Sequence, residues 1–215
     1  MWIGTYVDGL VVYDQQKRTL KNYSNNPDDA NSISSNRITC IKQDKDNQVW
    51  IGTNNGLNLL INERFSHFYH DPQKYNSINN NAITALEVDP FGRIWVGTQG
   101  GGLNMVTKEN DGFLISRYTS NSKFGRISND YILSLFADNN GYLWIGTDNG
   151  GLNRLNIPMG IVDVYQSEDG YNNTINSNSI WSLFGDDEDR IWIGTYNRGI
   201  NVIDKNSENL NFTRD

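Results

Sequence analysis

Five copies of one short phrase set the organisation of this chain. The phrases are "WIGTYVDGL" from Trp2, "WIGTNNGL" from Trp50, "WVGTQGGGL" from Trp95, "WIGTDNGGL" from Trp144 and "WIGTYNRGI" from Trp192. The tryptophans that open them are 48, 45, 49 and 48 residues apart. Self-similarity at such a period is typical of repeat architectures, in which each repeat is a supersecondary unit that buries its apolar faces against its neighbours.

Each full repeat contains four short runs rich in Ile, Val, Leu, Trp, Tyr and Phe, which predict strands. The first run, such as "ILSLFAD", is almost continuously apolar, as expected for a strand that is buried on both faces. Turns such as "DPFG" and "DNNG" follow it, because Asp and Asn bond their own backbone and Gly adopts positive φ. Four antiparallel strands in every period predict the blade of a β-propeller.

The chain of 215 residues is therefore predicted to be a single all-β domain, a β-propeller of about five blade equivalents built of four-stranded antiparallel blades. The predicted blades are an incomplete first blade at 2–24, followed by full blades at 32–71, 77–120, 126–168 and 174–215. We expect the Trp-Ile pairs to fill the core between blades, with the tryptophans that open the last four phrases at equivalent buried sites. We expect the Gly-Thr and Gly-Gly steps to turn the chain into the third strand of each blade.

The first blade lacks its first strand, whereas "NLNFTRD" supplies the last blade with its own fourth strand. The chain is thus expected to be a piece of a larger sensor that exposes an unpaired strand edge, and such edges seek partners. Five blade equivalents would either nearly close into a ring or lead two chains to associate through the incomplete blade.

Composition excludes several classes of protein. A net charge of −7 argues against nucleic acid or an anionic membrane as the main partner. The apolar runs are far shorter than the roughly 18 residues of a membrane span, and the first residues do not resemble a signal peptide. One cysteine excludes an internal disulfide framework.

The pattern "SIxxNxI", then "DxxGxLWIGT", then "GGL" and an aromatic-rich run resembles the two-component regulator propeller repeat over essentially the whole chain. That repeat forms the periplasmic sensor region of hybrid two-component system histidine kinases in Gram-negative bacteria that degrade complex glycans. In that family two seven-bladed propellers and an immunoglobulin-like domain precede a membrane span, a histidine kinase, a receiver and a DNA-binding region. The resemblance implies a periplasmic sensor module of an inner-membrane receptor that responds to glycan fragments, with an oligosaccharide as ligand.

The residues that look reactive have structural counterparts in the other repeats, so no catalytic residue, metal site or cofactor is predicted. Cys40 corresponds to Ala85, Ser134 and Ser182, which indicates a packing position for a small side chain. His67 and His70 are three residues apart in a predicted strand and therefore lie on opposite faces. The aspartate-rich turns lack the Gly and the closing Glu of a calcium loop, and the acids at 186–189 lie in one turn rather than across a cleft.

Strand order predicts which face binds a ligand. The turn between the second and third strands shares a face with the link into the next blade, and both are rich in Asn, Ser, Tyr and Gly, with Arg37, Arg126 and Arg198 nearby. Amides and hydroxyls both donate and accept hydrogen bonds. The predicted ligand-binding residues are those directly after each Gly-Thr, with one arginine: Tyr6, Asn54, Gln99, Asp148, Tyr196 and Arg198.

Trp181 is an additional candidate, since its repeat counterparts are Thr39, Thr84 and Leu133. It is either a core residue or a ring that lines the axis and stacks on a ligand. Two other functions remain open. One is a propeller-built enzyme, such as a polysaccharide lyase or a streptogramin-lyase-like protein, which needs acid, base or metal residues converging at the axis. The other is a protein-interaction scaffold, for which propellers are often used.

Overall fold

The computed structural model describes residues 1–110, 112–168, 171, 173–204 and 212–214. The regular elements of the described residues are all strands, which form five antiparallel sheets in sequence order. The first three sheets are β1 (Trp2–Gly4), β2 (Leu10–Asp14) and β3 (Thr19–Tyr23); β4 (Ile38–Gln43), β5 (Val49–Thr53), β6 (Gly56–Ile61) and β7 (Arg64–Phe68); and β8 (Ile83–Val88), β9 (Ile94–Thr98), β10 (Leu103–Glu109) and β11 (Gly112–Tyr118). The last two are β12 (Ile132–Ala137), β13 (Tyr142–Thr147), β14 (Leu152–Asn156) and β15 (Ile161–Tyr165); and β16 (Ile180–Gly185), β17 (Arg190–Thr195), β18 (Ile200–Asp204) and β19 (Thr213–Arg214).

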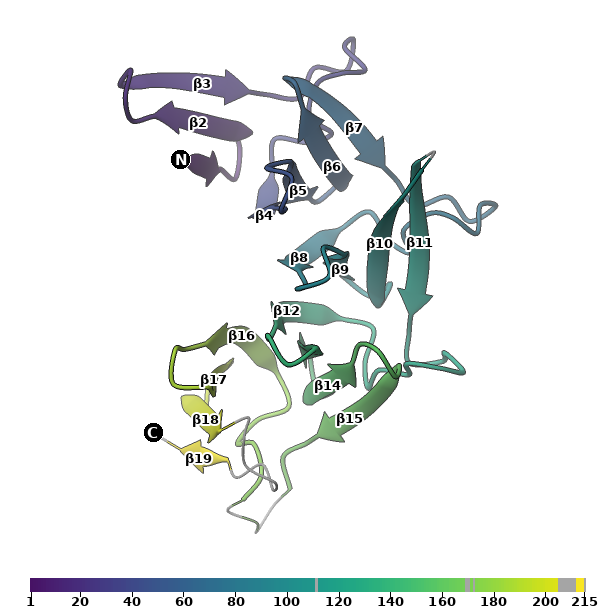
Figure 1. Ribbon diagram of the computed structural model, residues 1–215, viewed down its shortest axis with the longest axis vertical. Helices are drawn as coiled ribbons and strands as arrows, with labels where there is room; N and C mark the ends of the chain where they lie inside the picture. Colours follow the sequence, from purple (N-terminus) through teal and green to yellow (C-terminus); the bar gives the residue numbers. More distant parts are fainter. Residues whose placement is uncertain (111, 169–170, 172, 205–211, 215) are drawn as a thin grey trace.

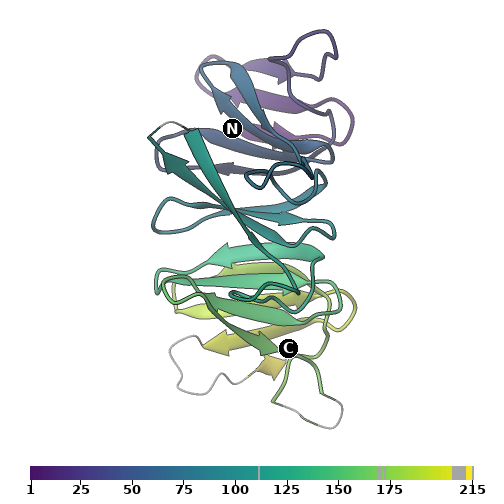
Figure 2. The same cartoon turned by 90° about the vertical axis from the view of Figure 1, so that its right-hand side faces the viewer.

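The sheets lie side by side around an axis, with β4, β8, β12 and β16 toward the centre and β3, β7, β11 and β15 outside (Figure 1). This arrangement confirms the predicted propeller of four-stranded blades with an incomplete first blade. The blades form an open arc, and the two terminal sheets stand apart across the opening rather than nearly closing a ring (Figures 1 and 2). The first part of "NLNFTRD" lies outside the described residues, and β19 pairs with β18 as the fourth strand. No described helix is long and apolar enough to cross a membrane.

The tryptophan that opens each phrase packs against the sheet that follows it. Trp50, Trp95 and Trp144 are at most 1% exposed, and each shares an apolar cluster with aliphatic side chains of the next blade. This confirms the prediction that these residues fill the core between blades. The prediction is wrong for Trp192, which is only half-buried because no further sheet covers that side of the last blade.

The glycine of each Gly-Thr step has a packing role that differs from the predicted turn. Gly52 lies within β5, and a Cβ atom there would be 2.7 Å from Cγ2 of Ile83 in the next blade. Gly97 and Gly146 meet the first isoleucine of the following inner strand in the same way. The absence of a side chain therefore lets neighbouring blades approach closely. The turn itself depends on later glycines with positive φ, Gly102 and Gly151.

Candidate functional site

Backbone hydrogen bonds hold the turn between the second and third strands of a blade against the links between blades. Within the second to fifth blades, the amides of Asn54, Gln99, Asp148 and Tyr196 donate to link carbonyls at residues 37, 82, 131 and 179. Gly151 N–H also donates to Asn178 O, at 2.8 Å, in the link into the next blade. These bonds place turns and links on one face, as predicted. We call it the link face: turns 5–9, 53–56, 98–102, 147–151 and 195–199 with links 33–37, 78–82, 127–131 and 175–179.

The predicted ligand-binding residues occupy equivalent positions on the link face, and most contact a link. The Arg37 guanidinium lies 4.5 Å from the centre of the Tyr6 ring. Ser35 Oγ donates to Asn54 Oδ1 at 2.6 Å, and Ser179 Oγ donates to Asp148 Oδ1 at 2.8 Å. Gln99 forms an isolated β-bridge with Tyr131. The face is therefore a row of exposed polar and aromatic groups that follows the arc.

Trp181 belongs to this row and not to the core. Its side chain is 56% exposed, and its ring stacks on Tyr196 with centroids 5.2 Å apart and planes inclined by 28°. The core interpretation is wrong because Trp181 points away from the preceding blade, where Ile180 is fully buried. Tyr6 follows β1 in the first sheet and Tyr196 follows β17 in the last, and these sheets lie at opposite ends of the open arc, so the structure does not bring these two predicted residues together.

A polar cavity of about 340 Å³ opens on the link face between the fourth and fifth blades. Link residues 176–179 and turn residues 196–198 form most of its wall, with Asn149 and Ser167 completing it. It brings together two of the predicted residues, Tyr196 and Arg198. Sequence analysis did not predict the cavity, because it depends on how one turn lies against one link.

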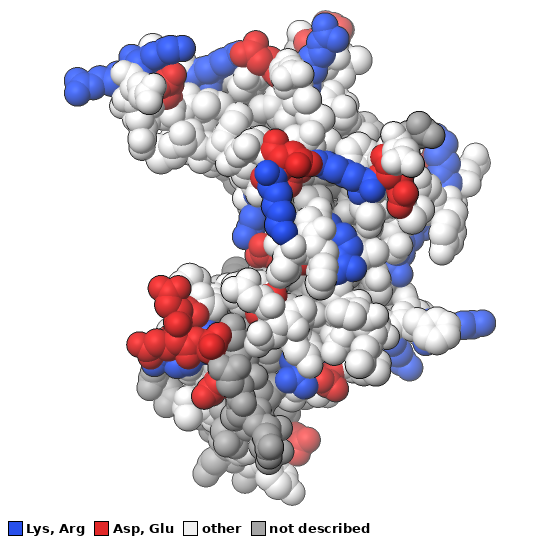
Figure 3. Space-filling view, viewed as in Figure 1, with Lys and Arg blue, Asp and Glu red and all other residues white. Residues whose placement is uncertain are grey.

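The opposite face carries the turns between the first and second strands, and we call it the aspartate face: turns 44–48, 89–93, 138–142 and 186–190. Figure 3 shows acidic and basic side chains mixed on it, with acids gathered over the β16–β17 turn. Lys108 bridges Asp44 and Asp46 at 3.2 and 2.5 Å. These charges therefore pair with one another within the face.

The first aspartate of each such turn has a role that sequence analysis missed. Asp138 Oδ1 accepts hydrogen bonds from its own turn, from the Asn140 and Tyr142 amides, and its Oδ2 accepts one from Trp144 Nε1 at 2.9 Å. The same three bonds recur around Asp44, Asp89 and Asp186. The constant six-residue spacing from aspartate to tryptophan was the signal that could have revealed this pair. The carboxylates are thus occupied by the fold.

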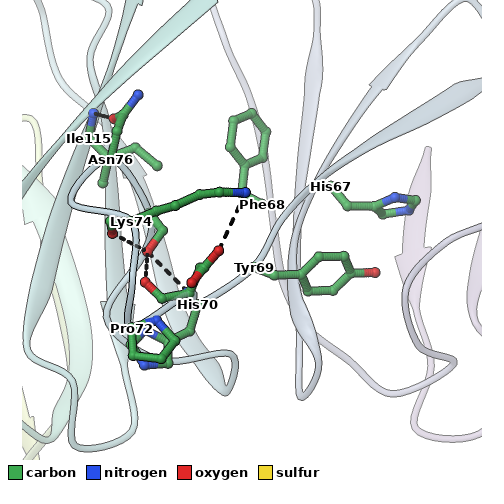
Figure 4. Close-up of a pocket in the computed structure, with 10 residues that line it drawn as sticks. His67, Phe68, Tyr69, His70, Pro72, Lys74, Asn76 and Ile115 are labelled. Carbon is green, nitrogen blue, oxygen red and sulfur yellow. Dashed lines mark hydrogen bonds and ion pairs between the residues drawn. The ribbon is translucent and has the colours of Figure 1, made fainter.

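The remaining reactive side chains are also engaged. Burial raises the pKa of the Cys40 thiol to about 12. The thiol packs against Gly52, where a Cβ atom would lie only 2.4 Å from the Cys40 Sγ. Figure 4 shows His67 and His70 pointing apart on the outer edge, beside a cavity of about 450 Å³. Their ring nitrogens contact the backbone carbonyls of Ser32 and Ile78 at 2.8 Å. Among the described residues, no group of three His, Cys, Asp or Glu side chains has a metal-binding arrangement.

Comparison with known proteins agrees with this architecture. Residues 32–55, 77–100, 126–149 and 174–197 match the family described as two component regulator propeller. Four of the blades are therefore two component regulator propeller repeats. Each match runs from the link, through the aspartate turn, to the beginning of the turn on the link face. The repeat thus includes both faces of the blade.

Solved structures with similar folds include extracellular domains of hybrid and one component systems. An extracellular domain assigned to a hybrid two component system of B. thetaiotaomicron superposes with a TM-score of 0.76 at 22% identity, covering 100% of this chain and 26% of that one. A second B. thetaiotaomicron extracellular domain, assigned to a one component system, gives a TM-score of 0.74 at 28% identity, covering 94% of this chain and 25% of the other. The chain thus spans about a quarter of the extracellular domains it resembles.

Two further proteins resemble this chain over different lengths. A segment of 60 residues is 31% identical to histidine kinase P4 of Formosa agariphila, which is 28% of this chain and 4% of that protein. A virginiamycin B lyase from Staphylococcus aureus has a similar fold, with a TM-score of 0.70 at 15% identity over 100% of this chain and 66% of the lyase. At that identity the likeness shows the fold alone.

The propeller repeats share one more polar contact, which sequence analysis also missed. An asparagine near the start of each third strand is fully buried, and its Oδ1 accepts the amide N–H of the link: Asn58, Asn104, Asn153 and Asn201. The recurring "LN" or "IN" after the last glycine of the phrase was the signal. This bond ties the third strand to the link and sets the shape of the link face.

Proposed function

We propose that this chain is a sensor module that recognises glycan fragments on its link face. The observation that carries the proposal is the exposed, stacked pair of Trp181 and Tyr196, which continues a row of polar groups along one face. Large exposed aromatic rings offer an apolar surface with little conformational freedom to lose. Sugars present both C–H faces and hydroxyl groups, and this face offers a complement to each.

The similarity to extracellular domains of two component systems supports a sensor role rather than catalysis. The first aspartate of each aspartate turn is held by its own turn and by a tryptophan, and both histidines contact backbone carbonyls. A single histidine-to-alanine change leaves the S. aureus lyase catalytically inactive. The histidines of this chain lie on the outer edge of the second blade, away from the axis where a propeller enzyme would gather its groups.

The same similarity supports a place outside the cytoplasm. The structures that this chain resembles are extracellular domains. We infer that the chain is the periplasmic part of a membrane-anchored receptor, with the signalling domains elsewhere in the parent protein. The glycan ligand, the membrane anchor and the kinase belong to this proposal.

The experiment is calorimetric titration of the purified chain with a panel of oligosaccharides. Trp181→Ala is expected to weaken saccharide binding at least tenfold, because it removes the stacked partner of Tyr196. The matched control is Phe91→Ala, which removes an aromatic side chain that is 62% exposed on the aspartate face. If binding is lost with Phe91→Ala and kept with Trp181→Ala, the ligand binds the aspartate face and the proposed binding face is wrong. Turnover of a polysaccharide by the chain would contradict the absence of catalysis.

A further inference from the structure

The polar cavity between the fourth and fifth blades occurs where the last repeat departs from its neighbours. The fourth residue after the glycine of the Gly-Thr step is itself a glycine in the third and fourth blades, Gly101 and Gly150. A Cβ atom on Gly101 would lie 2.7 Å from Cβ of Asn80 in the link, and a Cβ atom on Gly150 would lie 2.6 Å from Cβ of Asn129. A side chain at that position cannot fit while the turn packs against the link. The fifth blade has Arg198 at this position, and there the Asn176 side-chain amide of the link donates to the Arg198 backbone carbonyl.

The link residue that faces the turn is smaller in the fifth blade. Asn80 and Asn129 correspond to Ser177, which lines the cavity together with Arg198. Two sequence changes on opposite walls thus create the cavity, and its volume of about 340 Å³ lies within the range of roughly 300–1,000 Å³ for small-molecule sites.

A third change leaves two buried polar atoms without partners, one of them on a residue that lines the cavity. In the fourth blade the Asn153 amide donates to Ser128 Oγ at 2.8 Å, and Asn58 and Ser34 form the same bond in the second. The fifth blade has Asn176 in place of this serine. The buried atoms Asn176 Oδ1 and Asn201 Nδ2 have no hydrogen-bond partner. Asn176 lines the cavity, so its unmatched acceptor suits a hydroxyl group, which can donate to it.

The charge of the cavity is positive, although the chain as a whole is acidic. Its lining contains one charged side chain, Arg198, among asparagine, serine and tyrosine side chains. No hydrogen bond or ion pair of the Arg198 guanidinium occurs within the described part of the chain. Asp148 in the turn of the neighbouring blade accepts a hydrogen bond from Ser179 and does not line the cavity. A guanidinium without a partner binds carboxylates through two parallel hydrogen bonds.

From these observations we infer that the cavity binds an acidic sugar residue, a uronic acid within a glycan fragment. Arg198 holds the carboxylate, Asn176 takes a ring hydroxyl after a small rotation of its side chain, and Tyr196 packs beside the ring. The inference rests on the proposed function and names the substrate class of its binding face. It also assigns the specificity to one blade, since the third and fourth blades have glycine where Arg198 stands.

The test compares oligosaccharides that differ only in charge. Calorimetric titrations of the chain use trimers of galacturonate, glucuronate and mannuronate, and the methyl esters of the same trimers. At least one uronate trimer is expected to bind at least tenfold more tightly than its methyl ester. Arg198→Gln, which keeps the length of the side chain, is expected to abolish that difference. Arg126→Gln is the matched control, because it removes the same charge from a link without touching the cavity.

A second variant separates binding from folding. Asn176→Ser restores the serine of the second and fourth blades as a partner for Asn201, so the free chain is expected to unfold at higher urea while binding the uronate less tightly. Three results would overturn the inference: equal binding of uronate and ester, a preference for uronate that survives Arg198→Gln, or tighter binding by Asn176→Ser. Binding of neutral trimers alone would leave the proposed function standing. Binding of no saccharide by the chain would overturn both.

Discussion

Replacing Asp138 by asparagine is expected to destabilise the fourth blade far more than the loss of one charge. Asp138 is 2% exposed and Trp144 is 1% exposed, so water cannot replace a lost bond between them. An asparagine that keeps the two turn amides on its Oδ1 must point its own N–H groups at the indole N–H. If the amide flips to accept from the indole, it loses both turn bonds.

The magnitude follows from the bonds at stake. A hydrogen bond to a charged group contributes about 1.5–3 kcal/mol, and the two turn bonds weaken further when their acceptor becomes neutral. Asp138→Asn should therefore lower the free energy of unfolding by about 2–4 kcal/mol. With a urea slope near the upper end of about 1–3 kcal/mol/M, the unfolding midpoint should fall by ~1 M.

The assay is equilibrium urea unfolding followed by tryptophan fluorescence at pH 7. Asp187→Asn is the matched control, since it removes a carboxylate from an exposed position of the equivalent turn in the last blade, and it should stay within about 0.5 kcal/mol of the parent chain. The double variant Asp138→Asn/Trp144→Phe should lose clearly less unfolding free energy than the sum of the losses of the two single variants, because both changes break the same hydrogen bond. An Asp138→Asn midpoint equal to that of the parent would refute this account of the aspartate-tryptophan pair.

Three further outcomes are expected. Trp144→Ala should cost about 3–5 kcal/mol, as for large core aromatics, and Trp192→Ala should cost clearly less because it is half-buried; equal urea midpoints would contradict this. The indole of Trp192 and the Arg190 amide and side chain hold the pKa of Asp186 well below its usual value. Burial alone would raise the pKa of Asp44, but hydrogen bonds from Trp50, the Gln48 amide and Lys108 outweigh burial and lower it. The stability they contribute is complete above the unfolded aspartate pKa of about 3.9 and should be lost as pH falls below that value towards the lower pKa of the folded state. An unfolding midpoint that does not change as pH falls below about 3.9 would contradict the assignment. Phe184 is 63% exposed at the open end of the arc, so self-association measured by light scattering should decrease with Phe184→Ser, and a parent chain that is monomeric at every concentration would rule this out.

The sequence predicted the blades because each strand and turn recurs with one period. A single repeat is ambiguous, but five aligned copies show which positions tolerate change. The other repeats have small residues at the position equivalent to Cys40, which indicated a packing position. The structure confirms this, because the Cys40 thiol packs against Gly52. The burial of Trp192 could not be predicted from its copies, because burial depends on the neighbouring sheet and not on the repeat itself.

The binding face followed from strand order, whereas the cavity did not. The equivalence of Asn54, Gln99, Asp148 and Tyr196 is a property of the repeat, and their shared backbone bonds agree with it. The cavity arises instead from a departure from the repeat, where Arg198 replaces a glycine that must pack closely. The need for glycine there becomes visible only when the distance from turn to link is known.

Recognition of saccharides by the link face can be tested by locating the bound ligand on the molecule. The most direct measurement is the mapping of backbone amide chemical shifts by NMR while the chain is titrated with the tightest-binding oligosaccharide of the panel. If the link face binds the saccharide, the shifts should centre on the amides of Asp148, Tyr196 and links 127–131 and 175–179. Shifts confined to the aspartate face, at turns 44–48, 89–93 and 138–142, or to the outer cavity beside His67 and His70, would contradict it.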